Sequence, residues 1–128
     1  MKEPVRTEAA PAPFQGAPYS QAIKANGFVF VSGQLALRPG AKELVPGGIV
    51  EQTEQVFANL RAILEASGSS LERIVKTTVF LQSLDDFAAM NEVYARQVGD
   101  TPPARSTFEV AKLPSGALVE IEAVALGE

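Results

Sequence analysis

Arg105, Glu120 and Glu122 are the residues of this 128-residue sequence whose types and placement best suit chemistry. Arg105 follows Pro102 and Pro103, which restrict the backbone before it, so its guanidinium should point in a reproducible direction. A fixed guanidinium binds a carboxylate through two charge-assisted hydrogen bonds. Glu120 and Glu122 are two residues apart in an apolar segment, so their carboxylates share one strand face with limited room for water. The sequence therefore offers a clamp for an acidic ligand and a pair of carboxylates with limited access to water.

The absence of His and Cys excludes many enzyme classes. Catalytic triads and imidazole metal sites need His, whereas thiol enzymes and disulfide scaffolds need Cys. The sequence also lacks the G-x-G-x-x-G, Walker A and G-x-S-x-G motifs, so we expect neither a metal nor a cofactor. An ion pair of Arg105 with Glu120 or Glu122 across neighbouring strands is the alternative interpretation, and it needs no chemistry.

The composition is that of a folded globular domain: 46% of the residues are hydrophobic and 20% are charged. The 11 basic and 15 acidic residues give a net charge of −4, and the basic ones are scattered, so nucleic acid is not the expected main partner. We expect a single domain over 1–128, with a proline-rich, extended N-terminal arm at 1–17. The first residues lack the apolar region of a secretion signal, which favours a cytoplasmic protein.

Hydrophobic periodicity predicts two helices and several strands. The expected elements are a strand at 27–32; a second strand at 34–37 or 42–45 around a turn at Pro39-Gly40; a helix from 49 that ends at Gly68; a central strand at 74–81; a helix after Ser83 that ends at Gly99; and strands near 104–110 and 118–126. Each helix has one apolar stripe, so both should pack on one face of a single sheet. On the last strand, the alternate residues that face away from the helices are half apolar. This pattern weakly indicates that self-association covers that face of the sheet.

Several separated motifs resemble the Rid family of reactive intermediate deaminases, also called YjgF-like proteins. The motifs are Pro103-Ala104-Arg105-Ser106-Thr107-Phe108, Val119-Glu120-Ile121-Glu122-Ala123, Ala17-Pro18-Tyr19-Ser20-Gln21-Ala22, Val31-Ser32-Gly33-Gln34, the strand at 74–81, and Asp86-Phe87 with Asn91 and Tyr94. They agree in order and spacing from about Pro13 to Leu126, which makes the resemblance specific.

The resemblance implies an α+β, chorismate-mutase-like fold in which a single mixed sheet carries two helices on one face, assembled as a homotrimer with ligand sites between subunits. It also places the last two strands on either side of the 74–81 strand, whereas the sequence alone suggests a hairpin. The implied activity is hydrolysis of 2-imino or 2-enamino acids, such as 2-iminobutanoate and 2-iminopropanoate, to 2-keto acids and ammonia. Such imines already hydrolyse in water, so positioning and modest acid-base catalysis suffice.

By the same resemblance, Arg105 clamps the substrate carboxylate, and Glu120 activates water and handles the proton of the departing nitrogen. The residues implied to line the pocket are Tyr19, Ser32, Gly33, Phe87, Asn91 and Thr107, some of them from a neighbouring subunit. Without the resemblance, the better interpretation is structural: Tyr19 as a loop anchor, Ser32-Gly33 as a turn, Phe87 as a core residue and Asn91 as a solvent-exposed helix residue.

Two residues depart from the family pattern. Ala17 stands where many members have Gly, and Thr107 stands where many have Cys, so both bear on the substrate range and thiol chemistry does not carry over. Two other functions remain alternatives: a non-enzymatic, ligand-binding or chaperone-like trimer, and an endoribonuclease or translation inhibitor. The negative charge and the lack of His make the ribonuclease the poorer fit.

Overall fold

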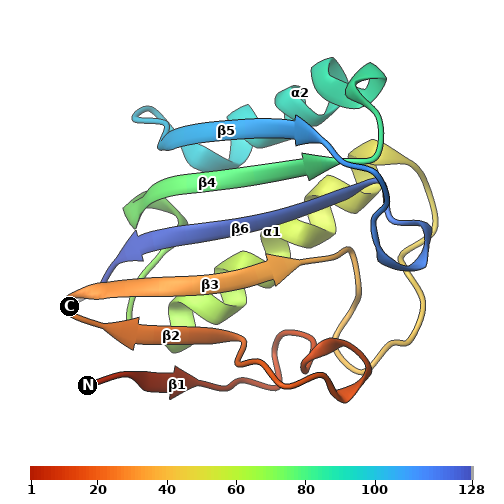
Figure 1. Ribbon diagram of the computed structural model, residues 1–128. Helices are drawn as coiled ribbons and strands as arrows, with labels where there is room; N and C mark the ends of the chain where they lie inside the picture. The colour runs from red at the N-terminus through yellow and green to blue at the C-terminus, as the bar shows by residue number, and fades with distance from the viewer. Residues whose placement is uncertain (128) are drawn as a thin grey trace.

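The computed structural model describes residues 1–127, which form one six-stranded mixed sheet with two α-helices (Figure 1). The strands are β1 Glu3–Val5, β2 Ala22–Ala25, β3 Phe28–Gln34, β4 Ile74–Leu81, β5 Ala104–Glu109 and β6 Val119–Leu126, and the helices are α1 Ile49–Ala66 and α2 Phe87–Val98. The strand order is β1-β2-β3-β6-β4-β5. Only β4 and β5 pair in parallel.

Both predicted helices are present, and both lie behind the sheet in Figure 1, on the same face. Helix α1 is followed by Gly68 at a φ of 80°, the left-handed conformation expected of a helix-ending glycine. Before α2, the hydroxyl of Ser83 accepts a hydrogen bond from the backbone N–H of Asp85 at 3.1 Å, so Ser83 caps the short 3₁₀ turn Leu84–Asp86 that leads into the helix.

The central strand is also confirmed, because β4 lies between β6 and β5. The last two strands therefore flank β4 and form no hairpin, as the family resemblance implies. The strand expected at 34–37 or 42–45 is wrong: the chain does turn at Pro39-Gly40, but only Leu37 and Leu44 pair, as an isolated bridge.

The sheet begins earlier than the sequence predicts. Strand β1 pairs with β2, so the start of the segment expected as an arm is an edge strand. Strand β2 pairs with β3 across a two-residue turn at Asn26 and Gly27, whose φ angles of 55° and 84° are both positive. Positive φ at both turn residues is the pattern of a type I′ hairpin.

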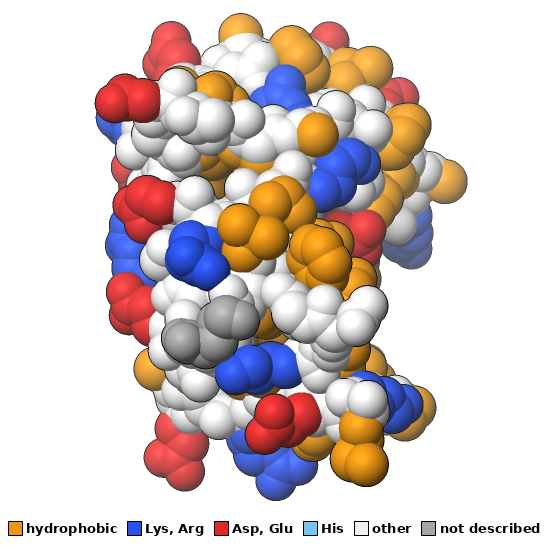
Figure 2. All heavy atoms as spheres, turned by 90° about the vertical axis from the view of Figure 1, so that its left-hand side faces the viewer, with side chains coloured by type: hydrophobic (Ala, Val, Ile, Leu, Met, Phe, Trp, Pro, Cys, Tyr) orange, Lys and Arg blue, Asp and Glu red, His pale blue; other side chains and the backbone are white. Residues whose placement is uncertain are grey.

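The two faces of the sheet differ in what covers them. Val79 and Ile121, which are neighbours on β4 and β6, are fully buried beneath the helices. The opposite face, here called the open face, carries large exposed apolar side chains: Phe28, Phe30, Phe108 and Leu126. In Figure 2, charged side chains line the left-hand margin, on the helix side, and hydrophobic ones gather toward the right, where the open face lies.

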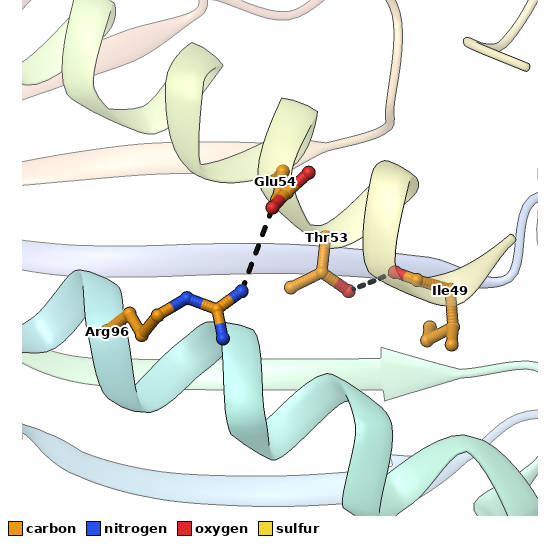
Figure 3. Close-up of polar contacts among 4 residues, drawn as sticks. All are labelled: Ile49, Thr53, Glu54 and Arg96. Atoms are coloured by element: carbon orange, nitrogen blue, oxygen red, sulfur yellow. Dashed lines mark hydrogen bonds and ion pairs between the residues drawn. The ribbon is translucent and has the colours of Figure 1, made fainter. Parts of the chain in front are cut away.

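The two helices contact each other, and Figure 3 shows polar contacts in this region. A guanidinium nitrogen of Arg96 on α2 lies 3.7 Å from a carboxylate oxygen of Glu54 on α1. Nearby, the hydroxyl of Thr53 donates to the carbonyl of Ile49 at 2.7 Å within α1. None of the helices in residues 1–127 combines the length and apolar character that a membrane crossing requires.

Candidate active site

Glu120 lies in a cavity at one end of the open face. Glu120 on β6 pairs with Phe80 on β4, and the next pair along the two strands is the buried Ile121 and Val79. Adjacent residues of a strand point to opposite faces, so the Glu120 side chain points away from the helices. The cavity has a volume of about 400 Å³. It is lined by four of the predicted site residues, Tyr19, Ser32, Gly33 and Glu120, and by Glu122 and the N-terminal segment. We call these four residues and this space the glutamate cavity.

A β-bulge shapes the wall of the glutamate cavity. The pairing of β3 with β6 changes register between Val31 and Gln34, which frees Ser32 and Gly33 from the ladder. The Ser32 hydroxyl donates to the carbonyl of Ser20 at 2.6 Å. A β-carbon built on Gly33 would lie 3.0 Å from the carboxyl carbon of Glu120 and closer still to one carboxylate oxygen. Only glycine therefore leaves the Glu120 carboxylate in its place.

Tyr19 is fixed at the mouth of the same cavity, and its ring is partly exposed. Its phenolic oxygen accepts a hydrogen bond from the backbone N–H of Phe14 at 2.6 Å. The buried Gln21 side chain ties down the segment that carries Phe14. Its amide nitrogen donates to the carbonyls of Thr7 and Pro11, at 3.0 and 2.7 Å.

The environment of Glu120 favours its protonated form. Burial raises the pKa of the Glu120 carboxyl above its usual range, and the negative charge of Glu122 raises it further. A raised pKa makes the ionised carboxylate a stronger base than that of an ordinary glutamate. Glu120 is therefore suited to general acid-base chemistry.

Arg105 lies at the start of β5 and is held by helix α2. Its Nη1 donates to the side-chain oxygen of Asn91 at 2.7 Å. Its guanidinium carbon lies 4.7 Å from the ring centroid of Tyr94 and 5.5 Å from that of Phe87. We call Phe87, Asn91, Tyr94 and Arg105 the arginine cluster. The family motifs include Tyr94 without giving it a role in the site, whereas here its ring supports the cation.

Thr107 follows Arg105 on the same face of β5, since alternate residues of a strand share a face. Its hydroxyl oxygen is buried and has no hydrogen-bond partner among residues 1–127. A buried hydroxyl without a partner is uncommon in folded proteins. Beside Arg105, it leaves one polar group available to a ligand or a water molecule.

The glutamate cavity and the arginine cluster lie on opposite faces of the sheet. On β4, Arg105 is the neighbour of Thr77 and Glu120 is the neighbour of Phe80, so their positions differ by three residues. An odd difference places the side chains on opposite faces, and three residues extend roughly 10 Å along a strand. The alternative ion pair of Arg105 with Glu120 or Glu122 is therefore wrong: the one salt bridge within residues 1–127 joins Arg96 and Glu54.

Neither half of the site resembles a metal centre. Within residues 1–127, no group of three or more Asp, Glu, His or Cys side chains is placed to hold a metal ion. What the arrangement offers is one cation with free donors on the helix side and one protonatable carboxyl on the open side. Within one chain the two groups face opposite sides of the sheet.

Comparison with known proteins identifies relatives along the whole chain. The family model described as Endoribonuclease L-PSP matches residues 7–127. The RutC family protein PH0854 of Pyrococcus horikoshii is 52% identical over 128 residues, which is 100% of both chains. A mouse protein named 2-iminobutanoate/2-iminopropanoate deaminase is 42% identical over 126 residues, covering 98% of this chain and 92% of its own.

The fold is shared with solved structures as well. The crystal structure of TdcF of Escherichia coli with bound serine superimposes with a TM-score of 0.90 at 36% identity, covering 98% of this chain and 99% of the other. The mixed sheet with two helices is thus the architecture of the relatives, and one of them holds an amino acid.

Proposed function

The chain belongs to the Rid, or YjgF-like, family, whose model is described as Endoribonuclease L-PSP, and we propose that it hydrolyses 2-imino acids to 2-keto acids and ammonia. The observation that carries the proposal is the way in which neighbouring side chains hold the Arg105 guanidinium. Its guanidinium is held by Asn91 and two aromatic rings, and the edge that Asn91 does not use is available to a substrate carboxylate. The name of the mouse relative supports 2-iminobutanoate and 2-iminopropanoate as the substrate class.

The reaction needs only groups that this chain has. Arg105 binds the carboxylate and so places the imine carbon. Glu120 in its ionised form takes a proton from the attacking water as the C–O bond forms and the π bond of the imine breaks, and it passes that proton to the nitrogen, which gives a carbinolamine. Glu120 then takes the hydroxyl proton and delivers it to the amino group, so the C–N bond breaks and ammonia leaves, which gives the 2-keto acid. General acid-base catalysis of this kind contributes roughly 10²–10⁴-fold.

We further propose that the site forms between two copies of the chain in a homotrimer. Arg105 and Glu120 face opposite sides of one sheet, so a substrate of a few atoms cannot touch both in a single chain. The exposed apolar side chains of the open face, such as Phe30 and Phe108, give a second copy a surface to cover. The arginine cluster of one chain would then complete the glutamate cavity of its neighbour, with Tyr19, Ser32, Gly33 and Thr107 as walls.

Mixed oligomers test the activity and the shared site together. The Arg105→Met and Glu120→Gln variants should each be inactive when expressed alone. The two chains are then co-expressed with different tags so that mixed oligomers can be purified. An amino-acid oxidase supplies the imine, and release of the keto acid is measured. If the site lies between chains, random mixing restores about a quarter of the sites, because a quarter of the neighbouring pairs combine an intact Arg105 with an intact Glu120. A site within one chain would restore none.

Two other outcomes would replace the proposal. If the wild-type protein binds 2-keto acids but does not accelerate imine hydrolysis, it is a ligand-binding protein of this family. RNA cleavage that survives purification, falls steeply with salt and disappears in Arg105→Met would instead support the ribonuclease that the family model is named for.

A further inference from the structure

Tyr94 is enclosed by contacts that fix its ring directly against Arg105. Tyr94 is 6% exposed. Its hydroxyl and that of the fully buried Thr77 share a hydrogen bond of 2.6 Å. From α1, the ring of Phe57 packs edge-on against it, with centroids 5.5 Å apart and planes at 80°. The remaining face of the Tyr94 ring meets the guanidinium of Arg105.

The residue that orients Tyr94 is also the strand neighbour of Arg105. Thr77 on β4 and Arg105 on β5 are paired in the ladder. The contacts therefore close a loop from the Arg105 backbone to Thr77, from Thr77 to the Tyr94 hydroxyl, and from the Tyr94 ring back to the guanidinium. A closed loop of this kind leaves the guanidinium plane little freedom to turn.

Helix α2 supplies the rest of the support at helical spacing. Phe87, Asn91 and Tyr94 are four and three residues apart, so they lie on one face of the helix. Asn91 accepts from Nη1, and the two rings lie against the guanidinium. Only Phe87 of the two rings is substantially exposed, so Tyr94 is the buried, rigid part of the support.

We propose that Tyr94, oriented by Thr77, is a positioning residue that holds the Arg105 guanidinium in one plane and thereby selects ligands with a planar carboxylate. This inference rests on the proposed function for the identity of the ligand. A guanidinium that turns freely must be ordered when it binds, so it gains less from the two coplanar oxygens of a carboxylate and discriminates less against a ligand with one acceptor oxygen. A fixed one presents its free edge in a single orientation, which favours two parallel hydrogen bonds to a carboxylate.

Binding of a 2-keto acid tests the inference without catalysis. The probe is 2-oxobutanoate, measured by calorimetry, with the uncharged 2-oxobutanamide as its comparison. The Tyr94→Leu/Thr77→Val variant removes the ring without leaving a buried hydroxyl unpaired. It should bind 2-oxobutanoate about 3- to 30-fold more weakly, which is the range that a cation–π contact supports. The matched Tyr94→Phe/Thr77→Val variant keeps the ring but loses the hydrogen bond that orients it, so its loss of affinity should be measurable and smaller than that of Tyr94→Leu/Thr77→Val.

Two further measurements separate positioning from general packing. Binding of 2-oxobutanamide should be weak and unchanged in both variants, because it does not depend on the fixed plane. In an Arg105→Met background, loss of the Tyr94 ring should have no additional effect, since the two residues act as one unit. Equal losses for the acid and the amide, or additive losses in the Arg105→Met background, would overturn the inference.

The same measurements distinguish this inference from the proposed function. If the predicted binding pattern appears in a protein that does not accelerate imine hydrolysis, the deaminase proposal fails and the role of Tyr94 stands. If the variants follow the pattern and the wild type is active, both stand. A wild-type protein that does not bind 2-oxobutanoate would overturn the inference, because Arg105 would then not be a carboxylate clamp.

Discussion

Replacing Arg105 by Lys keeps the positive charge but removes the planar fork, so it isolates what the guanidinium contributes. In the wild type, Nη1 is bonded to Asn91 at 2.7 Å and the other donors remain for a ligand. A lysine ammonium is a compact group with no flat edge, and it cannot bond Asn91 while it holds a carboxylate by two parallel bonds. At least one charge-assisted hydrogen bond to the substrate is then lost.

The size of the effect follows from that bond. A hydrogen bond to a charged group contributes about 1.5–3 kcal/mol. Each 1.36 kcal/mol corresponds to a factor of ten in rate, so Arg105→Lys should lower kcat/KM about 10- to 150-fold. Weaker stacking on Phe87 and Tyr94 adds to the loss, because those rings lie 5.5 and 4.7 Å from the guanidinium carbon.

The assay follows 2-keto acid release at low imine concentration, where the rate reports kcat/KM. An amino-acid oxidase generates the imine, and the uncatalysed rate is subtracted. Arg96→Lys is the matched control, since it makes the same change in an exposed arginine of α2 whose ion pair is with Glu54, at 3.7 Å. Exposed ion pairs contribute little, so the control should stay within about twofold of the wild type. An Arg105→Lys protein as active as the control, in the same oligomeric state, would refute the clamp.

Three other changes test the rest of the site. Gly33→Ala should lower activity at least about tenfold with little loss of thermal stability, because the new methyl group displaces the Glu120 carboxylate without disturbing the core, and kinetics with thermal melting checks both. Glu120→Gln should be more stable than the wild type at pH 7 but not at pH 3. In the wild type, the pKa of Glu120 is raised in the folded state, so the wild-type protein loses stability as the pH rises from the unfolded-state pKa through the folded-state pKa, whereas the Gln variant does not. Denaturant titrations at the two pH values measure this difference. Phe30→Glu should shift the protein toward smaller species in sedimentation, because it puts a charge on the apolar open face. A Phe30→Glu oligomer as stable as the wild type would place the interface elsewhere.

The helices and the central strand could be predicted because their signals are local. Helix α1 has a regular apolar stripe, and the β-branched run of β4 has no Gly or Pro. Strand β1 was not predictable in this way, since it has only three residues and Pro4 is one of them. Strand β2 did carry a signal, because Asn26-Gly27 is the sequence most typical of a two-residue hairpin turn.

The site was predicted as a set of residue types but not as an arrangement. The register of β4 with its two neighbours decides that Arg105 and Glu120 face opposite ways, and such long-range pairing has no local signature. The role of Tyr94 had a signal in the spacing of Phe87, Asn91 and Tyr94. The same spacing also fits a helix face that packs in the core. Tyr94 is buried, so it belongs to the core and also supports Arg105.

The separation of Arg105 from Glu120 has a chemical consequence for the single chain. If the two side chains lay close together on one face, they would form an ion pair, which would lower the pKa of Glu120 and occupy the free edge of Arg105. On opposite faces, Glu120 keeps a raised pKa and Arg105 spends only one of its donors, on Asn91. In the proposed assembly the two groups approach across a subunit boundary, where a substrate carboxylate takes the Arg105 edge and stands between them. In that assembly, a cation and a carboxyl with a raised pKa can lie near one small ligand because the fold keeps the two groups from neutralising each other before the ligand binds.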